Sequence, residues 1–342
     1  MSRQMSLRGA ERVLCGAVAF AAVACSGLAD GGETYCLTEG QGLGGCGTGG
    51  SSGDETPGGT GAWWCLDQTP VDPPFTPGNL AALILPVLEW GTRTPLMDRG
   101  LTATLCPTGN VTCENPLAAP ITIKSGLLGP AVGTLPPGAA GVPLQEGFDG
   151  FIKFDVAQDP SMPPVPEDQQ FASTFLYLNG IIAGPVSRGQ PVLMFQRRFR
   201  QGIVRDTFPS ADVNQVVSRG AVAVGVYDCD GKPVDNARVE LTTEGRPAPE
   251  ALPFILPPSR IPLPQTLGQP LVTQATGSAG FLNVPLGYVV VTAYQQDGGT
   301  RIGQVQLGSV AGQLTIGAVR PDFARKADIT GSVRVEPPPT SP

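Results

Sequence analysis

The stretch V-Y-D-C-D-G-K-P-V-D-N-A-R-V-E-L, residues 226–241, decides between two very different interpretations of this chain. Asp228, Asp230 and Asp235 lie close together in it, as carboxylates do both in metal sites and in tight turns. Apolar residues occupy every second position on both sides of this acidic cluster. A period of two is typical of half-buried β-strands, so the cluster lies between two expected strands.

The residues at the centre of the stretch favour a turn over a metal site. Asp230-Gly231 supplies a side-chain acceptor and a residue that tolerates positive φ, and Pro233 fixes φ where no ladder donor is needed. A calcium loop would continue with alternate carboxylates and a glutamate at its twelfth position, but Gly231-Lys232-Pro233 interrupts that series. The sequence therefore predicts a β-hairpin here and no metal site.

Short apolar runs separated by Pro and Gly extend in both directions from this stretch, at the spacing of an all-β protein. The expected strands are 81–89, 101–106, 151–156, 173–178 and 191–195 in a first series, and 221–227, 237–242, 280–284, 288–294, 302–307 and 313–318 in a second. With 36 prolines and 46 glycines, long helices are not expected. Only the segment 195–208 has the pattern of a short connecting helix.

The two series resemble one another, which indicates tandem domains. In the first, Pro95-Leu96 precedes G-L-T-A-T-L-C, and in the second, Pro233-Val234 precedes A-R-V-E-L-T. The period, about 140 residues, is too long for a solenoid. The expected fold class is all-β, with two tandem immunoglobulin- or prealbumin-like β-sandwiches after a signal peptide and a disordered, Gly-rich tether.

The N-terminal segment has the composition of an export signal. Arg3, Arg8 and Arg12 precede an apolar run over residues 13–24. As a helix this run would be about 18 Å long, well short of a hydrocarbon core of about 30 Å, so a membrane-spanning helix is not expected.

The end of this apolar run, A-V-A-C, resembles a bacterial lipobox, although Ala22 stands where leucine is more usual. The resemblance implies that Cys25 is lipidated. Ser26 after the cysteine is similar to the pattern of outer-membrane lipoproteins in Gram-negative bacteria. Acyl chains contribute about 0.8 kcal/mol per buried CH₂, so such an anchor would hold stably in the membrane. The alternative is an ordinary signal peptide cleaved near Ala29.

Composition excludes several classes of function. The 342 residues include no histidine, which excludes Ser-His-Asp triads and His-rich zinc sites. Removal of residues 1–24 takes away three of the 22 basic and one of the 29 acidic residues, and the resulting net charge of −9 argues against nucleic acid as a partner. No metal and no other cofactor is expected.

Paired carboxylates remain as an enzyme hypothesis, with Asp149, Asp155, Glu167 and Asp168 as candidates. Cleavage of glycans would need two carboxyl groups about 5 to 9.5 Å apart in one concave pocket. Ser-Lys catalysis lacks support because no S-x-x-K motif precedes an expected helix. We expect no catalytic residues and no enzyme activity.

Cysteines point to an oxidising compartment. Beyond Cys15 and Cys25, an even number remains, as in disulfide-bonded exported proteins: Cys36, Cys46, Cys65, Cys106, Cys113 and Cys229. Closeness in sequence favours the pairs Cys36–Cys46 and Cys106–Cys113. Cys65–Cys229 then follows by elimination.

The pattern V-x-D-x-D-G-x-P-V-x-x-A-x-V-x-L over 226–241 resembles the opening hairpin of carboxypeptidase regulatory-like domains, which are small prealbumin-like β-sandwiches. Gly280-Phe281, Val284-Pro285 and Val291-Thr292-Ala293 are similar to the second half of that pattern, whereas Gly277-Ser278-Ala279 departs from it. The resemblance covers 215–320 well and 63–195 poorly. It implies exported lipoproteins of Gram-negative bacteria that carry two such domains, with no catalytic residue to transfer.

The expected organisation is a lipoprotein signal peptide (1–24), a disordered Gly/Ser/Thr-rich tether (25–62), a divergent first β-sandwich (63–196), a linker with a possible short helix (197–214), a carboxypeptidase regulatory-like second sandwich (215–326) and a Pro-rich tail (327–342). Such a chain is expected to be a non-enzymatic outer-membrane lipoprotein that acts as a structural or interaction module. A carbohydrate-binding surface protein is the alternative. Partners would be the membrane, through the lipid, and a surface protein or glycan.

Three features are candidates for ligand or partner contact. Trp63 and Trp64 either stack on sugars or pack beside a cystine. The Pro-rich stretch 245–270, with Phe254 at its centre, is longer than an ordinary hairpin loop and is expected to expose apolar residues to a partner. A basic cluster either contacts anionic lipid headgroups or lies on a solvated linker helix: Arg197, Arg198, Arg200 and Arg205.

Overall fold

The computed structural model describes residues 63, 65–66, 76–90, 92, 95–96, 100–123, 139–157, 163–178, 186–188, 192–229, 231–257, 262–265, 269–296 and 299–321. All of them belong to one compact unit that spans residues 35–342. The expected signal peptide, tether and Pro-rich tail lie outside the described residues.

The first half of the described chain is built from short strands and one 3₁₀ turn: β1 (Leu80–Glu89), β2 (Leu101–Pro107), β3 (Ile121–Thr122), β4 (Ala139–Gln145), β5 (Gly150–Val156), η1 (Glu167–Gln169), β6 (Thr174–Tyr177), β7 (Val186–Arg188) and β8 (Val192–Met194). β1 pairs antiparallel with β4 and parallel with β7 and β8. β2 pairs with β3 and β5, and β5 pairs with β6, all antiparallel. These pairings form the two sheets of one sandwich.

The second half begins with two helices and continues with strands: α2 (Arg197–Thr207), α3 (Val213–Ser218), β9 (Gly220–Val226), β10 (Arg238–Thr243), β11 (Arg246–Pro247), β12 (Leu252–Ile255), β13 (Leu263–Pro264), β14 (Leu271–Val272), β15 (Ser278–Val284), β16 (Gly287–Tyr294), β17 (Arg301–Ser309) and β18 (Leu314–Val319). All the strands expected from periodicity form, with ends within two residues of those expected. α2 lies where the sequence allowed a connecting helix.

The second half repeats the strand pairings of the first. β9 pairs antiparallel with β15 and parallel with β18, as β1 does with β4 and with β7 and β8. β10 pairs with β14 and β16, just as β2 pairs with β3 and β5. β16 in turn pairs with β17, just as β5 pairs with β6. The fold is therefore all-β, with two β-sandwiches of one topology in tandem.

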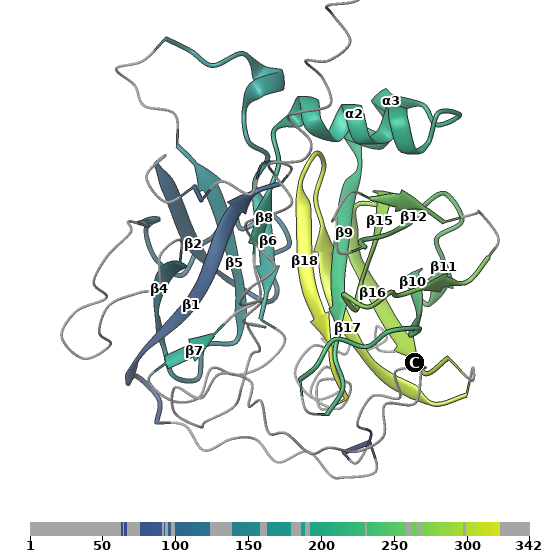
Figure 1. Cartoon of the computed structure of the whole chain (residues 1–342). Coiled ribbons are helices and arrows are strands. Elements are labelled where there is room, and N and C mark those ends of the chain that lie inside the picture. The colour runs from purple at the N-terminus through teal and green to yellow at the C-terminus, as the bar shows by residue number, and fades with distance from the viewer. Residues whose placement is uncertain are drawn as a thin grey trace, which may run out of the picture. The chain divides into compact units, whose positions relative to one another are not determined.

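One sheet continues through both halves. β18 of the second half pairs in parallel with β6 of the first, and Figure 1 shows β18, in yellow, between β9 and β6. The resulting nine-stranded sheet has the order β13-β12-β15-β9-β18-β6-β5-β2-β3. The repeat in the sequence indicates two similar units, but not that their sheets join edge to edge.

Each face of this long sheet lies against its own hydrophobic cluster. In β9, Val222, Val224 and Val226 belong to one cluster, whereas Ala221 and Ala223 belong to the other. Every residue of β9 is buried, so the expectation of a half-buried strand is wrong here. The physical reason is that the second face of β9, which would be exposed in an isolated sandwich, is covered by residues of α2, α3 and the first half.

Candidate functional site

The acidic stretch around Asp228 forms a tight turn. Asp228 is only 5% exposed, and its Oδ1 accepts a hydrogen bond from Lys232 N–H at 2.8 Å. Its backbone N–H donates to Lys232 O at 2.9 Å, and Gly231 N–H donates to Asp228 O at 3.0 Å. Gly231 has φ of 75°, the left-handed conformation that glycine adopts without strain. The Asp228 carboxylate therefore serves the backbone of its own turn.

The turn is a corner between two sheets, and the expectation of a β-hairpin between β9 and β10 is wrong. Val234 N–H donates to Val226 O at 2.9 Å, and Tyr227 bridges Pro233. Beyond that point β10 enters the smaller sheet, whereas β9 stays in the nine-stranded sheet. A period of two shows that one face of a strand is buried, but it does not identify the strand's partner.

Among the residues that the structure describes, no group of three or more His, Cys, Asp or Glu side chains could hold a metal ion. Asp230 is not among the residues that the structure describes. Within the same described part of the chain, no helix is both long and apolar enough to cross a membrane.

A disulfide fastens this corner to the start of the folded chain. Cys65 and Cys229 are bonded across a sequence separation of 164 residues, with 5.7 Å between their Cα atoms. Cys65 N–H also donates to Cys229 Sγ at 3.1 Å. The structure thus forms the pair that elimination had left, at the point where the expected tether ends.

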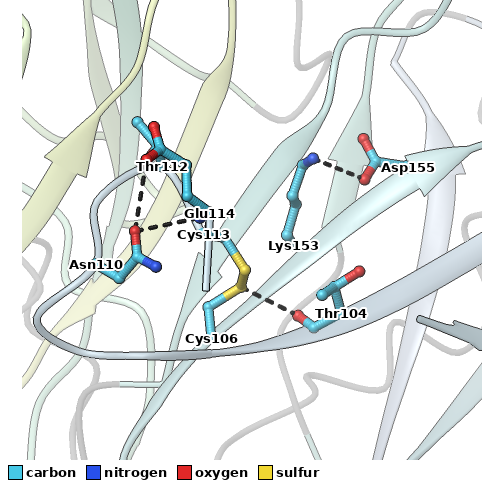
Figure 2. The surroundings of a disulfide bond; sticks show 8 residues. All are labelled: Thr104, Cys106, Asn110, Thr112, Cys113, Glu114, Lys153 and Asp155. Carbon is cyan, nitrogen blue, oxygen red and sulfur yellow. Dashed lines mark hydrogen bonds and ion pairs between the residues drawn. A yellow bond between two sulfur atoms is a disulfide. The ribbon is translucent and has the colours of Figure 1, made fainter. Parts of the chain in front are cut away.

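A second disulfide closes a short loop after β2. Cys106 and Cys113, both buried, are bonded with 5.4 Å between their Cα atoms, as expected from their closeness in sequence. Figure 2 shows that Asn110 lies inside this loop, where its Oδ1 accepts hydrogen bonds from Glu114 N–H and Thr112 Oγ1. Cys25, Cys36 and Cys46 lie outside the described residues.

Of the aromatic candidates, the structure describes Trp63 and Phe254, and neither is fully exposed. Trp63 is half-buried and packs against the hydrophobic cluster that contains Val222, whereas Trp64 lies outside the described residues. Phe254 is 1% exposed, and Ile255 and Leu256 are also buried. The expectation of exposure is wrong for these three residues, because β12 pairs with β15 and carries Phe254 into the core, whereas Leu263 on β13 is exposed.

Two of the candidate carboxylates are too far apart to act together. Asp149 and Asp155 are six residues apart along the extended β5 region, about 20 Å, whereas a glycosidase pair needs about 5 to 9.5 Å. Partial burial raises the pKa of the Asp149 carboxyl above its ordinary value. The Asp155 carboxylate accepts a hydrogen bond from Ser173 Oγ and pairs with Lys153 at 3.1 Å.

The other two carboxylates lie at a cavity of about 510 Å³ beside α2. Its lining comes from η1, the residue after β8, the start of α2, the end of α3 and the turn before β18: Glu167, Asp168, Phe195, Arg197, Arg200, Gln201, Val217, Ala311, Gly312 and Gln313. Glu167 is already paired, since its Oε1 lies 2.5 Å from Arg197 Nη1. Adjacent residues on a 3₁₀ turn point about 120° apart, so Glu167 and Asp168 do not face one another across the cavity.

Arg200 is the least exposed charged side chain at this cavity, at 3%. Its Nη2 donates to Val216 O at 2.8 Å and to Arg219 O at 2.9 Å, and its guanidinium lies over the Phe195 ring, 5.9 Å from the ring centre. Burial lowers the pKa of Arg200 to about 10, because removal from water disfavours the charged form.

The structure separates the four arginines that the sequence grouped as one basic cluster. Arg197 pairs with Glu167, and Arg198 and Arg205 are exposed. Arg200 is buried because it lies four residues before Val204 on the inner face of α2. Helical periodicity in the sequence could have predicted the burial of Arg200, because the apolar residue Val204, four positions later, marks the inner face of the helix. Gln313, also at the cavity, carried no comparable signal.

Comparison with known proteins adds little to this picture. The sequence matches no model of a known protein family and no curated protein. Among solved structures, a streptococcal ancillary pilin matches at 11% identity over 70% of this chain and 68% of its own, with a TM-score of 0.22. The minor pilin GBS52 of Streptococcus agalactiae matches at 10% identity over 70% and 94%, with a TM-score of 0.23.

The TIE protein of Bacillus anthracis matches at 11% identity over 71% of this chain, which spans only 34% of that protein, with a TM-score of 0.20. Likenesses of this size carry no inference about function. The sandwich fold follows instead from the strand pairings of the chain itself.

Proposed function

We propose that the protein is a non-enzymatic lipoprotein of the outer membrane, in which Cys25 carries the lipid and the two sandwiches form a structural or interaction module at the cell surface. Export is supported by the two disulfides, which persist in oxidising compartments and are rare in the cytosol. The sandwiches are of the carboxypeptidase regulatory-like type that the 226–241 pattern resembles.

The position of the Cys65–Cys229 disulfide is the observation that carries the proposal. Cys65 is close to the end of the Gly-rich segment, and Cys229 follows β9, which is paired inside the nine-stranded sheet. Tension on the N-terminal segment therefore reaches the central sheet of the molecule through a covalent bond. This is an arrangement suited to a folded module held by its N-terminus.

Anchoring is tested by metabolic labelling with palmitate and by fractionation of cells that express the full chain. We expect label and protein in the outer-membrane fraction, and we expect Cys25→Ala to lose both. Cys15→Ala is the matched control, since Cys15 lies inside the expected signal, and it should keep the label. Membrane association of an unlabelled Cys25→Ala variant would refute the lipid anchor.

Carbohydrate binding, the alternative function, has weaker support. It would need accessible aromatic rings, but Trp63 packs against the core and Phe254 is buried. A glycan array separates the two functions. Binding that is lost in Trp63→Ala, with the fold retained, would favour the carbohydrate-binding function over a purely structural one.

A further inference from the structure

The lining of the cavity beside α2 contains two opposite charges that form no ion pair with each other or with the other described residues. Of its four ionisable side chains, Glu167 and Arg197 neutralise each other. Asp168 and Arg200 have no ion-pair partner among the described residues. The lining as a whole therefore has no net charge, but it presents one isolated carboxylate and one isolated guanidinium.

Arg200 is held in place but is incompletely satisfied. The carbonyls of Val216 and Arg219, near the C-terminal end of α3, fix the guanidinium through Nη2. Its Nε and Nη1 are buried and have no acceptor. A buried cation without a counter-ion is expensive, and a buried donor without an acceptor typically destabilises a protein by about 1–3 kcal/mol. Such a group calls for an anionic partner that is not part of the described chain.

Gln313 adds an acceptor without a donor. Its backbone is fixed, because Gln313 N–H donates to Val310 O at 3.1 Å and Gln313 O accepts from Ala221 N–H at 3.0 Å. Its side-chain Oε1 is buried and has no hydrogen-bond partner. Arg200 and Gln313, both in the lining of the cavity, thus hold buried donors and a buried acceptor that are unused, and Asp168 adds an exposed carboxylate to the same lining.

We propose that this cavity binds a small zwitterion, an amino acid or a short peptide, with its carboxylate paired with Arg200 and its ammonium group directed toward Asp168 and Gln313. Arg200 provides the fork of donors that matches a carboxylate. A simple anion would leave Asp168 unpaired, and a simple cation would leave Arg200 unpaired. A ligand that carries both charges engages both side chains.

The volume of the cavity and the placement of its charged residues fit such a ligand. The cavity volume of about 510 Å³ lies within the range of about 300–1,000 Å³ that is common for small-molecule sites. Phe195 provides an apolar wall beside the guanidinium. Asp168 is exposed, so the ammonium end of the ligand lies at the mouth and the carboxylate end lies inside. This proposal does not depend on the lipid anchor.

The test is calorimetric titration of the mature chain with glycine, glycylglycine and triglycine. N-acetylglycylglycine and glycylglycine amide serve as probes that lack one charge each. We expect at least one zwitterion to bind, and each capped dipeptide to bind at least tenfold more weakly than glycylglycine. If no zwitterion binds at about 10 mM, or if the capped forms bind equally well, the proposal is wrong.

Substitutions locate the binding in this cavity. Asp168→Asn should weaken the binding of glycylglycine about two- to fivefold, as expected for a partly exposed charge pair. The same substitution should leave the binding of N-acetylglycylglycine unchanged. Asp206→Asn is the matched control, because Asp206 is an exposed carboxylate on α2 that does not line the cavity, and it should have no effect. Equal effects of the two substitutions would place the binding elsewhere.

Arg200→Met should reduce binding of every carboxylate probe at least 30-fold, since it removes the charged donor. Substitution of a buried arginine can also unfold the chain, so the far-UV circular dichroism of this variant is measured first. If the variant unfolds, the comparison of Asp168→Asn with Asp206→Asn decides the matter. A folded Arg200→Met variant that binds glycylglycine normally would overturn the proposal.

Discussion

The two halves of the molecule turn the same corner with different sequences. In the first half, Leu96 N–H donates to Val87 O at 3.0 Å, and in the second, Val234 N–H donates to Val226 O at 2.9 Å. Each bond lies where the chain leaves one sheet of a sandwich for the other. The backbone corner is therefore common to the two units, with an acidic residue, Glu89 or Asp228, at the same position in each.

The halves differ in what holds the loops around this corner. The second corner is cross-linked by Cys65–Cys229, and the long segment between β10 and β14 adds β11, β12 and β13 to the sheets. In the first half, the corresponding segment between β2 and β3 is short and is closed by Cys106–Cys113. One topology is thus stabilised by a long-range cross-link and added strands in one unit and by a local cross-link in the other.

The largest expected effect comes from the long-range cross-link. With loop-closure entropy as the measure, replacement of Cys65 and Cys229 by serine should lower the free energy of unfolding by about 5 kcal/mol. The same change at Cys106 and Cys113 should lower it by about 2.5 kcal/mol, because the closed loop is much shorter. Urea denaturation of the two double variants measures both values. Equal losses would mean that the two disulfides do not differ in range as the structure indicates.

The added strands of the second half provide the next test. Phe254→Ala should destabilise the protein by about 3–5 kcal/mol, because it empties a buried site in the core. Leu263→Ala, on the neighbouring strand β13, is the matched control, since Leu263 is 44% exposed and should cost less than about 1 kcal/mol. Similar values for the two variants in thermal denaturation would show that this segment is a surface loop, as its sequence suggests.

The two corners can be compared directly through Asp228 and Glu89. Asp228→Ala should destabilise by about 1–3 kcal/mol, because it removes the buried acceptor of Lys232 N–H. Glu89 occupies the matching position, is half-buried, and accepts hydrogen bonds from Thr92 Oγ1 at 2.8 Å and from Gln196 Nε2 at 3.2 Å. Glu89→Ala should cost less, about 1 kcal/mol, because the carboxylate keeps access to water whereas that of Asp228 does not. A larger loss for Glu89→Ala in urea denaturation would reverse this ranking.

The smallest expected effect on stability at neutral pH concerns Tyr177. This residue belongs to the first half, but its side chain packs in the hydrophobic cluster of the second half. Burial raises its pKa above the ordinary value near 10. Above that pH the unfolded chain loses this proton while the folded chain keeps it, so stability falls as pH rises, by about 1.4 kcal/mol per pH unit.

Tyr177→Phe should leave the free energy of unfolding at pH 7 within about 1 kcal/mol of the original value and reduce its slope above pH 10. Urea titrations at several pH values between about 8 and 11 measure that slope. Burial also raises the pKa of Tyr288, so part of the slope should persist. An unchanged slope in the variant would show that Tyr177 does not retain its proton in the folded state.

Periodicity in the sequence predicted most of the longer strands but missed others. The long apolar strands, such as β1 and β16, were found because branched and apolar residues recur along them. β4 was missed because its sequence, A-A-G-V-P-L-Q, contains Gly141 and Pro143. Proline is tolerated there because β4 has a partner, β1, on only one side. Strands of two residues, such as β3 and β14, carry no periodic signal at all.

The candidate site was the least predictable feature. The sequence grouped Arg200 with three other arginines because they are close along the chain, but helix geometry separates their side chains. Arg200, Asp168 and Gln313 come from three elements far apart in sequence, and only folding brings them to one cavity. Local pattern contains no information on such contacts.

The sequence by itself determined the all-β class, the repeat of two units, the disulfide chemistry and the exclusion of histidine-based catalysis. These features follow from composition and from short-range periodicity, which act within a few residues of chain. Tertiary structure alone decided that β9 and β10 belong to different sheets, that β18 joins β6, and that Phe254 is buried. These depend on which surfaces meet after folding, because a strand's pattern specifies a buried face but not the partner that covers it.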